Sequence, residues 1–137
     1  MHLDLPRFSH PYQRLCGSLL LIAASSLGLW SAWSMATYGA GTPLPTATAS
    51  ELVIAGPYHL VRNPMAVAGI TQGAAVGWLF GSIATIAYAL AGIFVWHVLV
   101  RPSEEADLKA RFGHDYIDYQ KSVNLWLPSL ARPNLRK

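Results

Sequence analysis

The feature that most constrains this chain is the absence of charge over two long stretches. No Asp, Glu, Lys or Arg occurs in residues 15–50 or in residues 63–100. The charged residues between these two stretches are Glu51 and Arg62. A helix needs about 20 predominantly apolar residues to cross the hydrocarbon core of a bilayer. Since one charge at mid-helix costs about 2.5–3.5 kcal/mol, uncharged stretches of this length predict helices that span a membrane.

The lengths of the two stretches predict how many spans there are. The first supplies one span over residues 15–38, where aromatic residues gather at the far end as at a membrane interface. The second is too long for one span, so it predicts a helical hairpin of residues 65–80 and 82–100. We therefore predict an all-α, polytopic membrane protein with about three transmembrane helices, forming a single membrane domain over residues 1–137.

Two further segments complete the predicted organisation. Residues 39–63 contain several prolines and glycines but are apolar for a loop, which predicts an interfacial segment partly buried on protein. After Val100 the chain becomes polar, and Pro102 followed by Glu104 and Glu105 is typical of a helix start. The sequence predicts a new helix at this point, ended by Gly113, within an amphipathic helical tail over residues 102–123.

Composition excludes several classes of protein. Only 12% of the 137 residues are charged and 53% are hydrophobic, whereas a soluble domain carries about 25% charged residues. A disordered tail, a coiled coil and a nucleic-acid binder are poor interpretations, and the net charge of +3 suits contact with membrane lipids better. Cys16 is the one cysteine, which rules out an intrachain disulfide and a thiolate metal cage, and we predict no metal site.

The predicted hairpin fixes which residues share a membrane face. Since it returns the chain to the side that it left, Arg62 and Glu104 lie at the same face. Eight basic residues belong to that face, while Arg7 and Arg14 belong to the opposite one. The positive-inside rule therefore places the Arg62 face in the cytoplasm, and we expect the protein in a bacterial inner membrane.

Four glycines are spaced so that they line one face of the second predicted span. They recur every four residues: Gly69, Gly73, Gly77 and Gly81. This spacing allows another backbone to come close. Contact with a neighbouring helix is the simplest interpretation. The alternatives are close approach of a ligand, or of a second subunit in a homo-oligomer or a larger membrane complex.

Four polar side chains are candidates for chemistry at the predicted Arg62 face. They are Arg62, His97, Glu104 and Glu105. His97 lies inside the end of the third span, where an ionisable group is a functional candidate by default. A histidine satisfied at the interface and a solvated helix start are the structural alternatives for His97 and for the two glutamates.

Two stretches of sequence resemble a known family. Residues 56–65, GPYHLVRNPM, resemble the signature G-P-Y-R-x-V-R-(N/H)-P-M-Y-x-G. Residues 104–123, EEADLKARFGHDYIDYQKSV, resemble E-E-x-x-L-x-x-x-F-G-x-x-Y-x-x-Y-x-x-x-V. Both patterns belong to integral-membrane methyltransferases typified by isoprenylcysteine carboxyl methyltransferase and phospholipid N-methyltransferase. The preceding GTPLP is similar too, so that the resemblance covers about residues 39–128.

The resemblance implies S-adenosylmethionine as methyl donor and a lipophilic acceptor, either an isoprenylcysteine carboxylate or a phospholipid amine. It implies catalytic roles for Arg62 and Asn63. It implies cofactor binding by Tyr58, His97, Glu104 and Glu105. Carboxylates suit the donor's hydroxyls, ammonium and sulfonium, and an arginine suits its carboxylate or an anionic acceptor.

The chain departs from the family pattern at several positions. His59 stands where arginine is usual, Ala66 where tyrosine is usual, and Asn124-Leu125 where the usual ending has Pro-Arg. The resemblance places the missing tyrosine at the donor pocket, so Ala66 indicates either a wider acceptor site or a chain that no longer catalyses. A non-catalytic subunit of a larger membrane complex is therefore the main alternative. A sterol-reductase-like membrane enzyme is a remoter one.

Overall fold

The computed structural model describes residues 6–40 and 49–130 of the chain. These residues are helical and contain no strand, apart from an isolated antiparallel bridge between Arg7 and Ser82. The elements, in order, are α1 (Gln13–Tyr38), η1 (Gly56–His59), α2 (Pro64–Leu79), α3 (Ile83–Val95), η2 (Trp96–Val100), α4 (Arg101–Phe112) and α5 (His114–Ser122). The predicted all-α class is confirmed. The segment GTPLP (residues 41–45), which also resembles the family sequence, lies outside the described residues.

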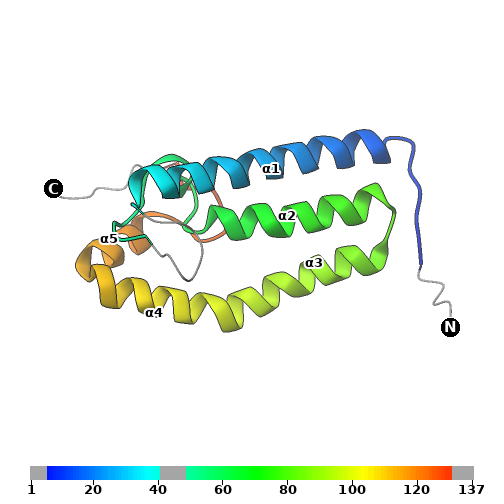
Figure 1. The fold of residues 1–137 in the computed structure, drawn as a ribbon. Helices are drawn as coiled ribbons and strands as arrows, with labels where there is room; N and C mark the ends of the chain where they lie inside the picture. The colour runs from blue at the N-terminus through cyan, green and yellow to red at the C-terminus, as the bar shows by residue number, and fades with distance from the viewer. Residues whose placement is uncertain (1–5, 41–48, 131–137) are drawn as a thin grey trace.

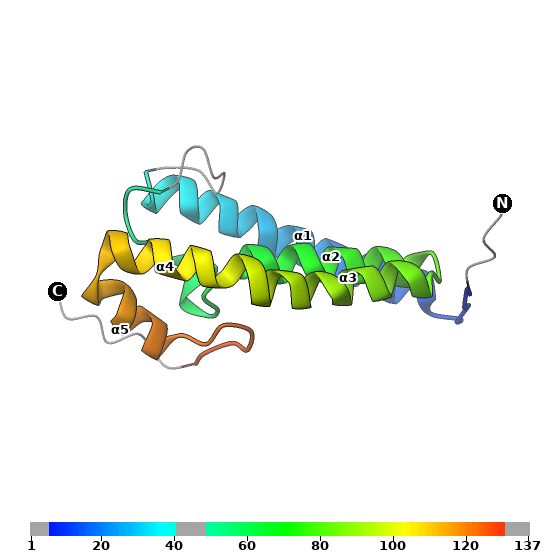
Figure 2. The same cartoon turned by 90° about the horizontal axis from the view of Figure 1, so that it is seen from below.

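The long helices form one layer. Helix α2 lies between α1 and α3, and the three run side by side (Figure 1). The α2–α3 turn lies at one end of the layer with the residues that precede α1, and η1, α4 and α5 lie at the other end (Figures 1 and 2). Arg62 and Glu104 therefore share one end of the molecule, as the hairpin predicts.

The packing between these helices uses small side chains, while large apolar side chains face outward. The buried helical residues include Ala24, Ser31, Ser34, Ala68, Ala75 and Ala89. The exposed ones include Leu19, Ile22, Trp33, Tyr88, Phe94 and Leu99. Small residues at helix contacts and apolar residues outside are typical of helices that pack in lipid. Within residues 6–40 and 49–130, two helices are long and apolar enough to cross a membrane, namely α1 and the continuous helix Ile83–Phe112.

The glycine face of α2 is used within the chain. A Cβ atom on Gly77 would lie 2.7 Å from Cγ1 of Ile86, and one on Gly73 would lie 3.2 Å from Cβ of Ala89. Both neighbours belong to α3, which confirms the helix contact for these two glycines. A Cβ on Gly69 would meet nothing within 4 Å. Contact of this face with a second subunit stays a prediction.

The predicted helix start at Pro102 is borne out in position but not as a separate helix. Helix α4 begins at Arg101 with Pro102 in its first turn, but no break separates it from α3, and one continuous helix runs from Ile83 to Phe112. Residues 96–100 form a π-turn in which the Arg101 N–H donates to the Trp96 carbonyl. This turn already breaks the regular α-helical ladder, so the missing N–H of Pro102 costs less than inside a regular helix. The Arg101 Nε also donates to the His97 carbonyl at 3.2 Å.

The C-terminal helix docks on the loop that precedes α2. Gly113, with φ +55°, ends α4 as predicted. The docking face is a cluster of three buried residues, Tyr116, Tyr119 and Val123. Leu52, Ile54, Leu108 and Phe112 pack against it. The predicted amphipathic face is thus a contact between α5, α4 and the loop, and it holds the loop beside the start of α2.

Candidate functional site

A cavity of about 430 Å³ lies at the end of the layer where the loop, α4 and α5 meet. Its volume is within the usual range for small-molecule sites, about 300–1,000 Å³. Of the six predicted site residues, it is lined by Tyr58, Arg62, Asn63 and Glu104. His97 and Glu105 are not among the lining residues. In this structure four of the six predicted site residues therefore face the cavity, and the other two lie outside its lining.

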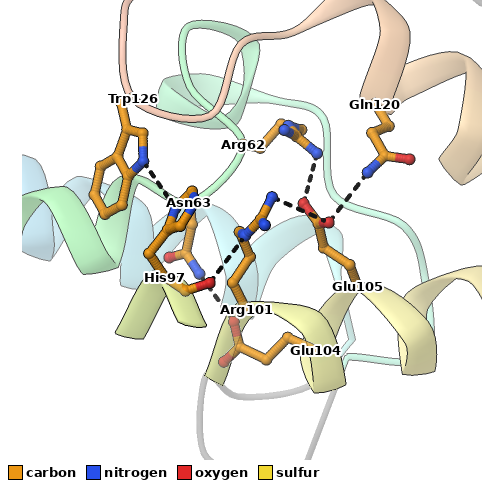
Figure 3. Close-up of polar contacts among 8 residues, drawn as sticks. All are labelled: Arg62, Asn63, His97, Arg101, Glu104, Glu105, Gln120 and Trp126. Atoms are coloured by element: carbon orange, nitrogen blue, oxygen red, sulfur yellow. Dashed lines mark hydrogen bonds and ion pairs between the residues drawn. The ribbon is translucent and has the colours of Figure 1, made fainter. Parts of the chain in front are cut away.

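Asn63 connects the start of α2 to α4. Its Oδ1 accepts a hydrogen bond from the Ala66 N–H at 3.0 Å, which caps the helix that begins at Pro64. Its Nδ2 donates to Oε2 of Glu104 at 3.2 Å (Figure 3). One amide therefore positions Glu104 relative to α2. Partial burial raises the pKa of Glu104 above its usual value, and the hydrogen bond from Asn63 opposes this shift.

Glu105 is the centre of a different network. Its Oε1 accepts from Nη1 of Arg62 at 2.6 Å, and its Oε2 accepts from Nε2 of Gln120 at 3.2 Å (Figure 3). Arg101 adds an ion pair at 3.7 Å. The side chains of Arg62 and Glu105 are only 13% and 14% exposed. This network joins the loop, α4 and α5 next to the cavity, and its central residue, Glu105, lies outside the cavity lining.

Arg62 is held from two sides and keeps one polar atom free. Its backbone N–H donates to the Asn124 carbonyl at 3.0 Å, and its Nη1 binds Glu105. Its Nε is buried without a hydrogen-bond partner among the described residues. Buried donors are rarely left unsatisfied in folded proteins, so this atom is a candidate contact for a bound ligand.

Tyr58 is presented to the cavity by a loop that needs glycine. Gly56 has φ +61°, and a Cβ there would collide with Oγ of Ser34 on α1. The Tyr58 carbonyl accepts from the Tyr119 hydroxyl at 2.6 Å in a buried position. Burial raises the pKa of Tyr58 to about 12, with a smaller contribution from the negative charge of Glu104, so Tyr58 is a neutral hydroxyl at physiological pH.

His97 faces the C-terminal segment. Its Nδ1 accepts a hydrogen bond from Nε1 of Trp126 at 3.3 Å, and the two rings are stacked with centroids 6.1 Å apart (Figure 3). His97 therefore contacts Trp126 in this structure and does not line the cavity. The predicted cofactor role of His97 stays a prediction.

The remaining charges of the cavity leave it acidic. Arg111 pairs with Asp107 at 3.3 Å and also donates to the Ala49 carbonyl, and Arg62 pairs with Glu105. Glu51 and Glu104 are the lining carboxylates without an ion-pair partner among the described residues. The unpaired charge that a ligand meets is negative. Among the described residues, no three His, Cys, Asp or Glu side chains lie close enough together to hold a metal ion.

The resemblance places position 66 at the pocket, and Ala66 does line the cavity. Sequence reasoning missed three other residues of the site: Met35 and Trp96 line the cavity, and Gln120 supports Glu105 from α5. These three carry no local signal, since helix phase and the docking of α5 decide where they point.

The fold and the site define a helical membrane protein with a mainly apolar ligand cavity at one end of its helices. Residues 12–115, about three quarters of the chain, match the model of the phospholipid methyltransferase family. The chain belongs to this family of methyltransferases. Comparisons with curated proteins and with solved structures gave no match.

Proposed function

We propose that this protein transfers a methyl group from S-adenosylmethionine to a lipophilic acceptor at the membrane face that carries Arg62 and Glu104. The observation that carries the proposal is the cavity itself. It brings Tyr58, Arg62, Asn63 and Glu104 together with apolar side chains in a family member. A cavity that combines a few polar groups with apolar walls suits a reaction between a polar donor and an apolar acceptor.

The residues present fit the donor. The carboxylate of Glu104 accepts hydrogen bonds from hydroxyl or ammonium groups and favours a sulfonium charge. The unpartnered Nε of Arg62 and the neutral hydroxyl of Tyr58 add donors for a carboxylate. When bound, S-adenosylmethionine supplies an electrophilic methyl group.

The chain's own contribution is positioning. Asn63 fixes Glu104 against α2, and Glu105 fixes Arg62 against α5. Holding two reactants in line supplies up to about 7–11 kcal/mol of the barrier reduction. These residues would hold the donor so that its methyl group lies in line with the acceptor.

Charge in the cavity favours an amine acceptor over a carboxylate. Glu51 and Glu104 attract a cation, whereas an acceptor carboxylate would meet like charge. An ammonium group has to lose a proton before it attacks. Glu51 and Glu104 are the candidates to accept this proton, because the third lining carboxylate, Asp107, is paired with Arg111.

The membrane arrangement that we propose has three spans. Helix α2 has 16 residues and is flanked by the two longer apolar helices, and the basic-residue count puts the Arg62 end in the cytoplasm. Cysteine labelling in a Cys16→Ala background tests this at the exposed positions 51, 80 and 115. Position 80 is preferred to the neighbouring Gly81, where a Cβ would collide with the Phe8 carbonyl. Labelling of all three positions from one side contradicts the hairpin.

The activity is tested with native membranes and methyl-labelled donor, with and without the protein. We expect label in an extractable amine-containing lipid, lost in Glu104→Gln and kept in the control Asp115→Asn, which changes an exposed α5 carboxylate outside the cavity lining. Label in a prenylated carboxylate identifies the other acceptor class. No labelled product, together with co-purification in fixed ratio with larger membrane proteins, supports the non-catalytic alternative instead.

A further inference from the structure

The segment that follows α5 ties together two parts of the cavity wall. We call residues 123–130 the C-terminal strap. The Asn124 carbonyl accepts from the Arg62 N–H at 3.0 Å, and the Ser129 N–H donates to the Leu60 carbonyl at 2.7 Å. These backbone bonds hold the strap on the loop that carries Tyr58 and Arg62. Figure 2 shows the strap leaving α5 and running back toward the bundle.

Between these two contacts the strap also reaches the π-turn. Trp126 donates from Nε1 to Nδ1 of His97 at 3.3 Å. Its indole also meets the indole of Trp96 edge-on, with ring centroids 5.3 Å apart and an interplanar angle of 75°. Edge-to-face aromatic pairs of this geometry are favourable beyond the area that they bury.

Trp96 and His97 are neighbours in sequence but have different places in the structure. Trp96 lines the cavity, and His97 does not. The π-turn of residues 96–100 directs both toward Trp126, and the Arg101 side chain holds the His97 carbonyl. Because Trp126 contacts both residues, its position is coupled to that of the cavity wall.

We propose that His97 and Trp126 form a latch that positions Trp96 in the wall of the cavity. His97 acts here as a positioning residue whose imidazole accepts the Trp126 N–H, so its role is exerted through Trp126 and not through contact with the donor. Trp96 is then the wall residue that limits the acceptor. This last step rests on the proposed function, whereas the latch itself does not.

The position of Trp96 matters because it stands where the apolar helix reaches the polar end of the site. Trp96 follows α3 directly, and among the described tryptophans it is the one that lines the cavity. A lipophilic acceptor enters from the apolar side, so a fixed indole there restricts the width of the acceptor chain. Release of the latch lets Trp96 change rotamer and widens the cavity.

The first measurement uses the ligand-free protein and circular dichroism. Two indoles 5.3 Å apart couple and give a paired band in the far ultraviolet, which disappears when one ring moves. We expect the band to be lost in Trp126→Ala and His97→Ala. It should be kept in His97→Asn, whose Oδ1 replaces the Nδ1 acceptor, and in the control Trp78→Phe at the other end of the molecule.

The second measurement follows access to the cavity at position 66, substituted by cysteine in a Cys16→Ala background. We expect the labelling rate with a maleimide to rise about 2- to 10-fold in His97→Ala and Trp126→Phe, the population change that loss of one net hydrogen bond produces. The rate should stay unchanged in His97→Asn and Trp78→Phe. Trp126→Phe keeps an aromatic ring, so it serves if His97→Ala does not fold.

A paired band and a labelling rate that are unchanged in His97→Ala overturn the latch. In the transfer assay, latch variants should accept bulkier acceptors than wild type does. If no variant and no wild-type protein transfers label, the proposed function fails while the two ligand-free measurements still decide the latch. If wild type transfers label but the acceptor range of the latch variants is the same, Trp96 does not limit the acceptor.

Discussion

Glu104 and Glu105 are consecutive residues whose carboxylates have different partners. Glu104 accepts from Asn63 at 3.2 Å and lines the cavity, whereas Glu105 accepts from Arg62 at 2.6 Å and does not line it. Successive side chains on a helix point about 100° apart. Glu104 therefore faces the cavity and Glu105 supports its surroundings, so substitution of each should give a different phenotype.

Glu105→Gln should lower the stability of the fold. The substitution leaves the Arg62 guanidinium largely buried without its counter-charge, and breaking a buried ion pair in this way costs about 3 kcal/mol. Unfolding in mixed detergent micelles measures the loss. Glu104→Gln is the matched control, because this carboxylate is only partly buried and forms no ion pair among the described residues. This substitution should change stability by less than about 1 kcal/mol. Equal losses for the two variants contradict the division of roles.

Glu104→Gln should weaken binding of S-adenosylmethionine or its demethylated product. A hydrogen bond to a charged group contributes about 1.5–3 kcal/mol, which corresponds to roughly tenfold or more in Kd. Calorimetry in detergent measures the change, with Asp115→Asn as the control outside the cavity. Absence of any binding heat at millimolar ligand in folded wild type disproves the donor pocket.

Donor binding should also depend on pH through Glu104. Burial raises its pKa above the ordinary value of 4.5, so acidification removes the negative charge at a higher pH than for an exposed glutamate. Binding of the cationic donor should weaken as pH falls through this raised pKa, and Glu104→Gln should flatten the dependence. The sign for stability is opposite: the folded state holds the proton more tightly, so this group's favourable contribution is complete below pH 4.5 and is lost as pH rises through the folded pKa.

Much of the fold is predictable from where charges are absent and where helices must begin and end. The uncharged stretches predict the apolar helices, and Gly113 predicts the end of α4. The amphipathic character of residues 102–123 predicts a helix with one apolar face, and this face docks α5 on the loop. These features are local, because each depends on a few neighbouring residues and on the cost of placing charge in an apolar environment.

The parts that were missed depend on tertiary contacts. Continuity through Pro102 requires a π-turn and a bond from Arg101 to the His97 carbonyl, neither of which has a sequence signal. The division between Glu104 and Glu105 depends on helix phase at the cavity. The pairing of His97 with Trp126 joins residues 29 positions apart, and nothing in either local sequence indicates it.

Tyr119→Phe should destabilise the loop that presents Tyr58. The Tyr119 hydroxyl donates to the Tyr58 carbonyl at 2.6 Å in a buried position, so the substitution leaves a buried carbonyl unpaired at a cost of about 1–3 kcal/mol. Unfolding in detergent and donor affinity should both decrease. Tyr12→Phe is a suitable control because Tyr12 is 64% exposed. A Tyr119→Phe protein as stable as wild type contradicts the coupling of α5 to the loop.

Ala66→Tyr tests whether the small side chain is an adaptation for the acceptor. Ala66 lines the cavity at the first turn of α2, so a tyrosine there occupies space that is open in this chain. Donor affinity should change little, while turnover of the native acceptor should fall about tenfold or more, the discrimination that pocket size produces. Ala66→Phe separates volume from the hydroxyl, because a purely steric effect should be the same in both variants. Transfer of label to the same products at the same rate in all three proteins shows that position 66 does not select the acceptor, and restoration of activity by tyrosine to an inactive wild type identifies the chain as one that lost catalysis at this position.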